Sequence, residues 1–494
     1  MAAREPRHEA KEIELKLEFA PGDAARILSH PALAEGQAKT REPISIYYDT
    51  PDDALRKAGV FLRVRATGEG YVQTIKTARG DAEVFERNEW EQPVESHEPD
   101  LSGAAGTALE PLLTPEVRAA LIPRFHTRFR RKTYQLRRDG TAIELAIDQG
   151  EVTAGVEASP ISEVELELLS GDKRELFNLA RDLATCVPLT LAVKSKAERG
   201  FELLDGGDHS AEKATAVEIT PYMTCAEGFR TIARNCLRQI VANTPGVRAG
   251  HSDALHQMRV GLRRLRAGLT LFADLVAGPE RDHLKGELKW ITQELGPARD
   301  LDVLVADVLE PLRADRPDDA DLAAIAADFE VQHEAAYVRA TGAVRSDRFR
   351  KLLLDLAAWI EVGAWADASG GDPITEHATA KLSRLRRRVK KRGEVLRKLA
   401  PSKRHKLRIR AKRLRYATEF FAATFPGKAM EARREKSLSA LKDLQDALGE
   451  LNDIATRREI FPGAKGDSDK EPKLLDAAER AYARFAKVKA FWKD

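Results

Sequence analysis

Residues 256–266 read HQMRVGLRRLR and residues 405–415 read HKLRIRAKRLR, so one pattern occurs twice and indicates an internal duplication. Residues at i, i+3, i+7 and i+10 fall along one face of an α-helix, so each copy presents a basic stripe. The two stripes consist of His256, Arg259, Arg263 and Arg266, and of His405, Arg408, Lys412 and Arg415. Beside the first stripe, apolar residues such as Leu262 and Leu265 let the helix pack on others. The pattern predicts a duplicated helical region.

Positive charge is concentrated around the second copy. Residues 381–415 contain eighteen Lys and Arg and a single acid, Glu394. Because like charges repel and disfavour the compact state, this density indicates an anionic partner. A solvated helix surface is the alternative, and the duplicated histidine offset argues against it. Nucleic acid is a competing polyanion, but the chain shows no helix-turn-helix, zinc or RNP-type motif, and aromatic residues do not alternate with the basic ones.

Length and composition bound the remaining possibilities. A chain of 494 residues is too long for one ordinary core, so two or three domains are expected. Three cysteines give neither an even disulfide framework nor a metal spacing. The chain lacks an apolar signal segment and any run of eighteen apolar residues, which predicts a cytoplasmic protein without a membrane partner. A polar linker at 206–216 separates predicted domains at 1–205 and 217–494.

The part before this linker alternates polar and apolar residues with the period of a β-strand. The alternation is found in residues 12–18, 61–65, 71–76, 143–148 and 161–168. Turn residues such as Asp139-Gly140 join strands into antiparallel hairpins. Two helical patches, at about residues 21–35 and 173–186, are expected to cover apolar faces of the sheet.

The charged faces of these strands carry both signs. The acidic strands contribute Glu12, Glu14, Glu163, Glu165 and Glu167, and the basic ones contribute Arg63, Arg65, Lys76, Arg87, Arg131, Lys194 and Lys196. One interpretation is an antiparallel sheet with a solvated face and cross-strand ion pairs. The other is a barrel whose charged lumen holds ions. Carboxylates suit Mg²⁺ or Mn²⁺ and guanidinium groups suit phosphate, so the second interpretation predicts a metal-bridged phosphate substrate.

The same residues carry a family resemblance. Glu12-x-Glu14-x-Lys16 resembles the opening signature of the CYTH, or triphosphate tunnel metalloenzyme, superfamily. Further motifs follow in the family's order at residues 47–50, 62–65, 74–76, 87–91, 147–150, 163–167 and 194–196. The resemblance extends to about residue 204.

The resemblance implies an eight-stranded antiparallel β-barrel tunnel with flanking helices that binds triphosphate with Mg²⁺ or Mn²⁺ and cleaves a phosphoanhydride bond. It implies metal ligands at Glu12, Glu14, Asp148, Glu163 and Glu165. It implies phosphate ligands at Lys16, Arg63, Arg65, Lys76, Arg87, Arg131, Lys194 and Lys196. No residue is assigned as a general base. Phosphoryl transfer needs mainly positioning and charge neutralisation, which agrees with such a residue set.

A second resemblance covers residues 217–494. Residues 294–303 follow the first basic helix at about the distance at which residues 444–453 follow the second. This layout is similar to the CHAD domain, which implies an all-α fold of two duplicated four-helix bundles around a basic groove that binds inorganic polyphosphate. The ligands would be the two basic stripes, brought together by a pseudo-twofold axis. The histidines would gain charge beside an anion, or alternatively pair with Asp300 or Asp446.

Together these features predict a metal-dependent inorganic triphosphatase, which hydrolyses triphosphate to pyrophosphate and phosphate and carries a polyphosphate-binding helical domain. A non-catalytic protein that binds polyphosphate and is targeted to polyphosphate granules is the main alternative. Relatives with the same tunnel act on nucleotides or thiamine triphosphate, and those substrates stay open. Specific nucleic-acid binding is not expected.

Overall fold

The chain divides into two compact units. In the computed structural model, the first comprises residues Met1–Lys213, Leu237–Met258 and Val338–Val362, and the second comprises Ala214–Cys236, Arg259–Tyr337 and Gly363–Asp494. The structure describes residues 13–34, 36, 38–68, 70–77, 89–207, 211–368, 371–460 and 470–493. Two helical segments beyond residue 213 therefore fold with the N-terminal part. The boundaries at 205 and 217 stay a prediction.

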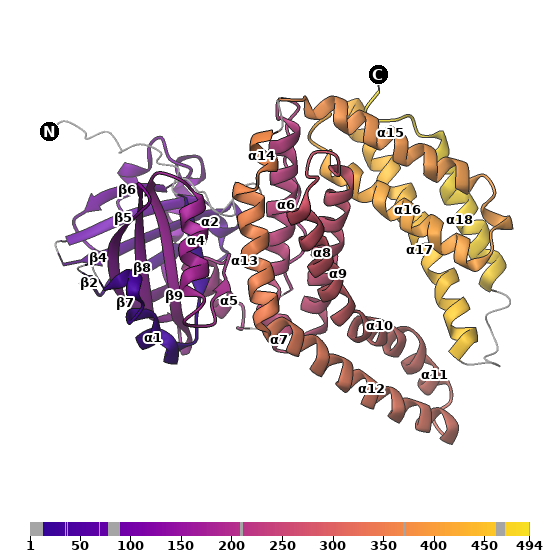
Figure 1. The fold of residues 1–494 in the computed structure, drawn as a ribbon, viewed down its shortest axis with the longest axis horizontal. Helices are drawn as coiled ribbons and strands as arrows, with labels where there is room; N and C mark the ends of the chain where they lie inside the picture. The colour runs from indigo at the N-terminus through magenta and orange to yellow at the C-terminus, as the bar shows by residue number, and fades with distance from the viewer. Residues whose placement is uncertain are drawn as a thin grey trace. The chain divides into compact units, whose positions relative to one another are not determined.

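The first unit is built on an antiparallel sheet (Figure 1). Its strands are β1 (Glu14–Glu18), β2 (Lys39–Arg41), β3 (Ile44–Asp49), β4 (Val60–Thr67), β5 (Gly70–Thr77), β6 (Glu89–Val94), β7 (Ile122–Arg138), β8 (Thr141–Ala154), β9 (Glu157–Ser170) and β10 (Thr190–Leu191). The hydrogen-bonded order is β10-β1-β9-β8-β7-β3-β4-β5-β6, and β2 also pairs with β7. The predicted antiparallel sheet is confirmed. It has ten strands in place of eight because it includes the short strands β2 and β10. Among the described residues, no pairing of the end strands β10 and β6 closes the sheet into a barrel.

Hairpin geometry follows from the turn residues. Asp139 and Gly140 have φ angles of 44° and 76°, the left-handed values of a two-residue hairpin turn, and they connect the long strands β7 and β8. In an antiparallel pair, directly opposed residues share a face of the sheet. The register therefore places the alternating charged residues of β1, β7, β8 and β9 on one common face.

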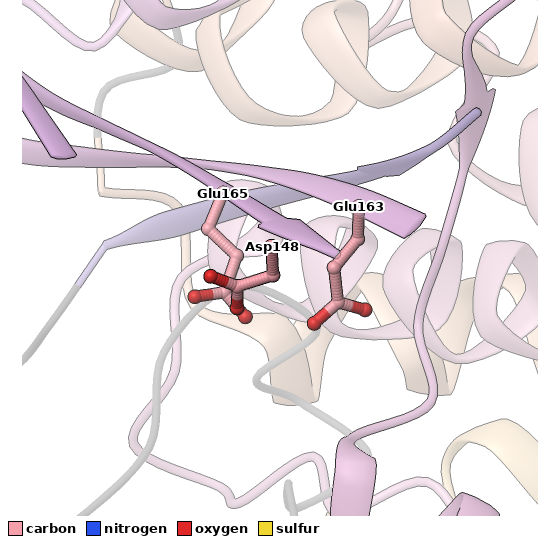
Figure 2. A group of neighbouring side chains, drawn as sticks. All are labelled: Asp148, Glu163 and Glu165. Atoms are coloured by element: carbon pink, nitrogen blue, oxygen red, sulfur yellow. The ribbon is translucent and has the colours of Figure 1, made fainter. Parts of the chain in front are cut away.

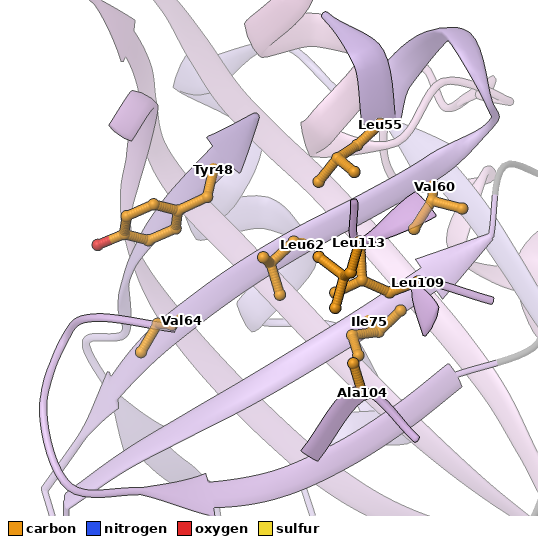
Figure 3. Close-up of a cluster of buried hydrophobic side chains, with 9 residues drawn as sticks. All are labelled: Tyr48, Leu55, Val60, Leu62, Val64, Ile75, Ala104, Leu109 and Leu113. Carbon is orange, nitrogen blue, oxygen red and sulfur yellow. The ribbon is translucent and has the colours of Figure 1, made fainter. Parts of the chain in front are cut away.

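Apolar residues of β4 and β5 point away from that face into a separate core. Leu62, Val64 and Ile75 are almost fully buried there, together with Leu109 and Leu113 (Figure 3). The covering segment contains the short 3₁₀-helices η3 (Leu101–Ala104) and η4 (Glu110–Leu112), and the helices α2 (Ala54–Lys57) and α3 (Pro115–Ala120) lie nearby in the chain. This apolar layer turns the charged side chains of β4 and β5 to the opposite face.

Three further helices belong to the N-terminal part: α1 (Ala24–Leu28), α4 (Arg174–Leu183) and α5 (Lys196–Leu204). The helical patches predicted near 21–35 and 173–186 correspond to α1, with flanking 3₁₀ turns, and to α4. Helix α5 packs on the charged face itself, where Phe201 and Ala197 join Phe125, Phe129 and Ile161 in one buried cluster. Helix α5 lies so close to the sheet that a Cβ on Gly200 would be 2.1 Å from the Phe125 ring.

The remaining chain is helical. Its longer helices are α6 (Cys225–Ala242), α8 (Ser252–Leu271), α9 (Pro279–Glu294), α10 (Gly296–Leu304), α12 (Ala320–Arg345), α13 (Asp347–Val362), α15 (Ile374–Gly393), α16 (Pro401–Phe420), α17 (Lys428–Ile460) and α18 (Lys470–Lys487). Shorter ones are α7 (Thr244–Arg248), α11 (Glu310–Asp315), α14 (Trp365–Ala368) and the π-helical η5 (Val305–Leu309). The two basic stripes lie on α8 and α16, as predicted. No helix in the described part of the chain has the length and apolar character needed to cross a membrane.

Candidate functional site

Three carboxylates meet on the charged face of the sheet. Asp148 of β8 lies directly opposite Glu163 of β9, and Glu165 is the next residue of β9 on the same face. One oxygen from each carboxylate lies within 4.8 Å of the others, and Figure 2 shows the three groups pointing into one space. Asp148 and Glu163 have no solvent exposure. Because buried carboxylates repel one another, cations must lie among them.

Three cations come from three different elements. Lys16 of β1 has its Nζ 2.7 Å from Glu165 and 3.6 Å from Glu163. Arg131 of β7 donates two hydrogen bonds to Asp148, at 2.8 and 2.6 Å, and a further one to Glu165. Lys196, the first residue of α5, lies 2.8 Å from Asp148 and 3.0 Å from Glu165, and it also contacts Glu163. The cluster therefore balances its own charge in the free protein.

This mutual pairing fixes the ionisation of the cluster. Burial alone would raise the pKa of Glu165, but Lys16, Lys196 and Arg131 together hold that pKa well below its usual range. Burial likewise opposes the charged form of Lys196, yet Asp148, Glu163 and Glu165 raise its pKa above the ordinary lysine value. Glu165 and Lys196 are therefore held in their charged forms, which suits them to exchange partners with a metal ion and an anion.

The oxygen donors fit a hard divalent cation. Asp148, Glu163 and Glu165 supply carboxylate oxygens, the ligand type that Mg²⁺ and Mn²⁺ prefer. Oε2 of Glu163 is buried and accepts no hydrogen bond from the described residues, although the Arg199 guanidinium lies 3.6 Å away. Glu14, which is 4% exposed, approaches the same group through Lys16, at 3.7 Å. The cluster thus has the composition of a divalent-metal site.

A second group of charges lies on β4, β5 and β6. Lys76 is 2.5 Å from Glu89, and Arg63 is 3.6 Å from Glu89 and 3.9 Å from Glu91. The like charge of Arg63, followed by burial and by Arg131, lowers the pKa of Arg65 to about 10. Since Arg131 also contacts the carboxylate cluster, Arg65 lies close enough to feel the cations of both groups. An anion bound among these arginines would relieve their repulsion.

The remaining predicted tunnel residues have different positions. Lys194 contacts Glu202 and lies 4.0 Å from Glu212, so it is not paired with the three carboxylates. Lys194 and Lys196 were expected on a strand, which is wrong. Ser195 instead caps α5 and forms a reciprocal capping box with Glu198, so Lys194 precedes the helix and Lys196 begins it. Glu12 and Arg87 lie outside the described residues.

A second cluster of cations joins α8 and α16. Burial and then the charges of Arg263, Arg408, Arg415 and Arg259 lower the pKa of Lys412 to about 7. The four guanidinium groups therefore lie near enough to the ammonium to act on its charge. Among the described residues no carboxylate pairs with Lys412, while Nε of Arg263 and Nε of Arg415 are buried without a hydrogen-bond partner. The five cations have only two carboxylates near them among the described ion pairs, with Glu419 3.5 Å from Arg415 and Asp300 3.6 Å from Arg259, so positive charge predominates in the cluster.

The duplication extends to the way that two of these arginines are held. Nη1 of Arg259 donates to the carbonyl of Thr292 at 3.4 Å, and Nε of Arg408 donates to the carbonyl of Gln445 at 3.3 Å. A glycine follows each carbonyl by four residues. A Cβ on Gly296 would lie 3.4 Å from Nη1 of Arg259, and one on Gly449 would lie 3.2 Å from Nη2 of Arg408. Both glycines therefore leave room for a guanidinium group.

The other residues of the basic stripes are placed less centrally. Arg266 is exposed and is not among the groups that shift Lys412. His405 is exposed, and its Nδ1 lies 3.1 Å from Oδ1 of Asn452, so its partner is not the Asp446 considered as an alternative. Asp300 lies 3.6 Å from Arg259. His256 is partly buried on α8.

Comparison with known proteins places these sites in families. Residues 10–201 match the CYTH domain, and residues 231–462 match the CHAD domain. The chain carries a CYTH domain followed by a CHAD domain. Over 205 residues it is 32% identical to an inorganic triphosphatase of Haemophilus influenzae, in a match that covers 39% of this chain and 55% of that protein. The chain thus spans about half the length of this curated relative.

Solved structures give two further likenesses. A crystal structure of the CHAD domain from the plant Ricinus communis is 30% identical, with a TM-score of 0.47, and the match covers 57% of this chain and 98% of that one. A Hippeastrum protein that was proposed to be an adenylyl cyclase, and is described as having a dominant triphosphatase activity, is 18% identical with a TM-score of 0.30. That match covers 39% of this chain and 95% of the other.

Some charged residues of both domains were not selected from the sequence. In the CYTH domain, Arg199 lies 3.6 Å from Glu163, and its position three residues after Lys196 on one helix face was the available signal. Glu91 accepts a hydrogen bond from Thr74 at 3.0 Å, and Glu89 pairs with Lys76. In the CHAD domain, Arg264 is 3% exposed and lies over the Phe420 ring. Its position among the apolar residues of α8 gave no indication in the sequence that it belongs to a site.

Proposed function

We propose that the CYTH domain hydrolyses inorganic triphosphate to pyrophosphate and phosphate with Mg²⁺ or Mn²⁺, and that the CHAD domain binds inorganic polyphosphate. One observation carries the first part: three carboxylates and three cations interleave on the charged face of the sheet. The similarity of this region to an inorganic triphosphatase supports the same activity.

In this proposal Glu14, Asp148, Glu163 and Glu165 hold the metal, which when bound supplies neutralisation of charge on the phosphate oxygens. The phosphate ligands are Lys16, Arg63, Arg65, Lys76, Arg131, Lys194 and Lys196. From the family resemblance, Glu12 is a further metal ligand and Arg87 a further phosphate ligand. These side chains come from several strands and one helix, so they contact a short linear anion from many directions. Phosphoryl transfer depends chiefly on such positioning and charge stabilisation.

Polyphosphate binding by the CHAD domain rests on the cluster of Arg259, Arg263, Arg408, Lys412 and Arg415. Burial and then like charges lower the pKa of its lysine, which has no carboxylate partner among the described ion pairs. A chain of phosphates supplies the regularly spaced negative oxygens that would satisfy several guanidinium groups at once. His256, Arg266 and His405 are proposed to extend the contact along the same chain.

Phosphate release by the purified full-length protein tests the first part of the proposal. Triphosphate, ATP and long-chain polyphosphate are compared with and without Mg²⁺. We expect hydrolysis of triphosphate that needs the metal and exceeds ATP hydrolysis by more than about tenfold, because a nucleoside adds bulk without a recognised pocket. Equal rates on ATP would assign the domain to nucleotides, and no hydrolysis of any substrate would favour a binding protein.

A matched pair of variants links the activity to the cluster. Glu165→Gln keeps the side-chain shape and removes one carboxylate charge from the cluster, and we expect at least a roughly hundredfold loss of kcat. Glu151→Gln makes the same change on the exposed part of β8, outside the cluster, and should leave the rate unchanged. Equal rates for the two variants would remove the cluster from the site.

A further inference from the structure

An arginine of helix α6 contacts the segment that carries Lys194 and Lys196, two of the proposed phosphate ligands. Arg238 lies within the stretch that matches CHAD, yet it belongs to the same compact unit as the sheet. Its Nη1 donates to the carbonyl of Val193 at 3.2 Å, and its Nη2 donates to Oε1 of Glu198 at 2.5 Å. One guanidinium group therefore holds both ends of the segment 193–198.

The held segment contains the cap of helix α5. The amide of Ser195 donates to Oε2 of Glu198 at 2.7 Å, and the amide of Glu198 donates to the Ser195 hydroxyl at 3.2 Å. Glu198 thus accepts from the helix cap with one oxygen and from Arg238 with the other. Lys194 lies just before the cap and Lys196 just after it, so the cap orientation decides where both ammonium groups point.

The ionisation of Glu198 depends on the same contacts. Burial raises its pKa, but the Arg238 charge, the Ser195 amide and the Ser195 hydroxyl more than offset this and lower the pKa to about 2. A carboxylate accepts hydrogen bonds more strongly than a neutral carboxylic acid does. Arg238 therefore keeps the cap in its ionised, strongly accepting form throughout the physiological pH range.

We propose that Arg238 is a positioning residue for triphosphate hydrolysis, which holds the 193–198 segment so that Lys194 and Lys196 face the substrate. The proposal rests on the function proposed above, since it takes these lysines as phosphate ligands. Neither domain match assigns such a role, because Arg238 lies outside the residues that match CYTH. Through this contact, a helix of the CHAD-matching stretch completes the CYTH site.

The test compares two variants of the full-length protein. Arg238→Ala removes the clamp. Arg181→Ala is the control: Arg181 donates to Asp355 at 3.0 Å, also joining the N-terminal part to a later helix, but outside the 193–198 segment. We expect Arg238→Ala to raise KM for triphosphate at saturating Mg²⁺ by about tenfold or more, because lysine contacts bind ground and transition states alike. Arg181→Ala should keep the parental KM.

Two further readouts separate positioning from general stability. In Arg238→Ala the pKa of Glu198 should rise, so the acid limb of activity should move to higher pH, and Glu198→Gln in the same background should abolish that movement. Amide hydrogen exchange should increase over residues 194–204 in Arg238→Ala and not in Arg181→Ala. Arg238→Lys, which keeps one charged donor, should recover part of the KM.

If the parent hydrolyses triphosphate and the two alanine variants share one KM and one pH profile, Arg238 has no positioning role. Increased amide hydrogen exchange in Arg238→Ala with an unchanged KM would also overturn the positioning role. If the parent hydrolyses nothing, the proposed function fails, and calorimetry of triphosphate binding decides the inference: weaker binding in Arg238→Ala alone supports it, and equal binding rejects it.

Discussion

At the scale of single residues, Lys412 links the chemistry of the CHAD cluster to pH. Burial and the charges of Arg263, Arg408, Arg415 and Arg259 lower its pKa to about 7, whereas an exposed lysine titrates near 10.4. Glu419 is the carboxylate whose ionisation responds to Lys412, and burial raises the pKa of Glu419. The lysine is therefore partly neutral near pH 7 in the free protein.

Polyphosphate binding should take up a proton at this position. A bound anion raises the pKa of Lys412, so above pH 7 the free protein must gain a proton to reach the bound state, and affinity should fall as pH rises from 7 to 9. Calorimetry at pH 8 in two buffers of different ionisation enthalpy measures the uptake. Lys412→Arg keeps a permanent charge and should abolish it. Uptake that persists in this variant would assign the proton elsewhere.

Glu14 offers a second prediction at this scale. Lys16 lies 3.7 Å from Glu14 but 2.7 Å from Glu165, so Glu14→Gln leaves this lysine paired with its closer carboxylate. We expect a change in unfolding free energy below about 2 kcal/mol, smaller than for breaking a buried pair outright. Activity should fall more than about tenfold and the Mg²⁺ requirement should rise. Thermal unfolding and a Mg²⁺ titration measure both, and an unchanged Mg²⁺ requirement would exclude Glu14 as a ligand.

At the scale of elements, the repeated arginine, carbonyl and glycine arrangement fixes two guanidinium groups against neighbouring helices. The arrangement joins α8 to α9 and α10 in the first copy and α16 to α17 in the second. The first copy is interrupted between Glu294 and Gly296, whereas α17 continues through Gly449. The glycine therefore leaves room for a guanidinium group at a break between two helices in the first copy and within a continuous helix in the second.

Gly449→Ala should separate stability from binding. Alanine in a helix interior stabilises by about 0.5–1 kcal/mol relative to glycine. Its Cβ, however, would lie 3.2 Å from the Arg408 guanidinium and displace it, so polyphosphate affinity should fall severalfold. Gly286→Ala in α9 is the control, because nothing lies within 4 Å of its Cβ, and it should gain stability without losing affinity. Loss of affinity in both variants would contradict the role of Gly449.

Elements differ in how well the sequence predicts them. Period-two alternation predicted β1, β4, β5, β8 and β9, because one apolar face must pack and the other must not. Lys194 and Lys196 were expected on a strand, but the capping box of Ser195 and Glu198 starts a helix there. Local hydrogen bonding of a short side chain thus decided the backbone conformation. Contacts such as Arg199 with Glu163 depend on the docking of α5, which no local pattern specifies.

At the scale of the whole molecule, the succession of a sheet domain and a helical domain was predictable from two sets of motifs and is confirmed. The assignment of residues 237–258 and 338–362 to the same compact unit as the sheet was not. Such grouping is set by side chains distant in sequence, including Arg238 with Glu198 and Arg181 with Asp355. Amphipathic periodicity identifies an apolar helix face but not its partner.

The two proposed sites should respond separately to mutation. Arg263→Gln combined with Lys412→Gln removes two cations from the CHAD cluster, so polyphosphate affinity should fall. The slope of log affinity against log salt concentration should also become shallower, by roughly 0.7 per lost charge. Triphosphate hydrolysis should stay near the parental rate, since neither residue belongs to the CYTH cluster. Affinity titrations between low and physiological salt, with rates measured in parallel, check both expectations. A matched loss of hydrolysis would show that the sites are coupled.

The balance of three carboxylates with three cations in the CYTH cluster has a thermodynamic consequence. A metal alone would leave Lys16, Arg131 and Lys196 facing one another without counter-ions, and an anion alone would do the same to Asp148, Glu163 and Glu165. Each ligand should therefore tighten the binding of the other, and this heterotropic coupling must be equal in both directions. The coupling free energy can be measured as the change in Mn²⁺ affinity when pyrophosphate is present. The change in pyrophosphate affinity when Mn²⁺ is present should give the same value.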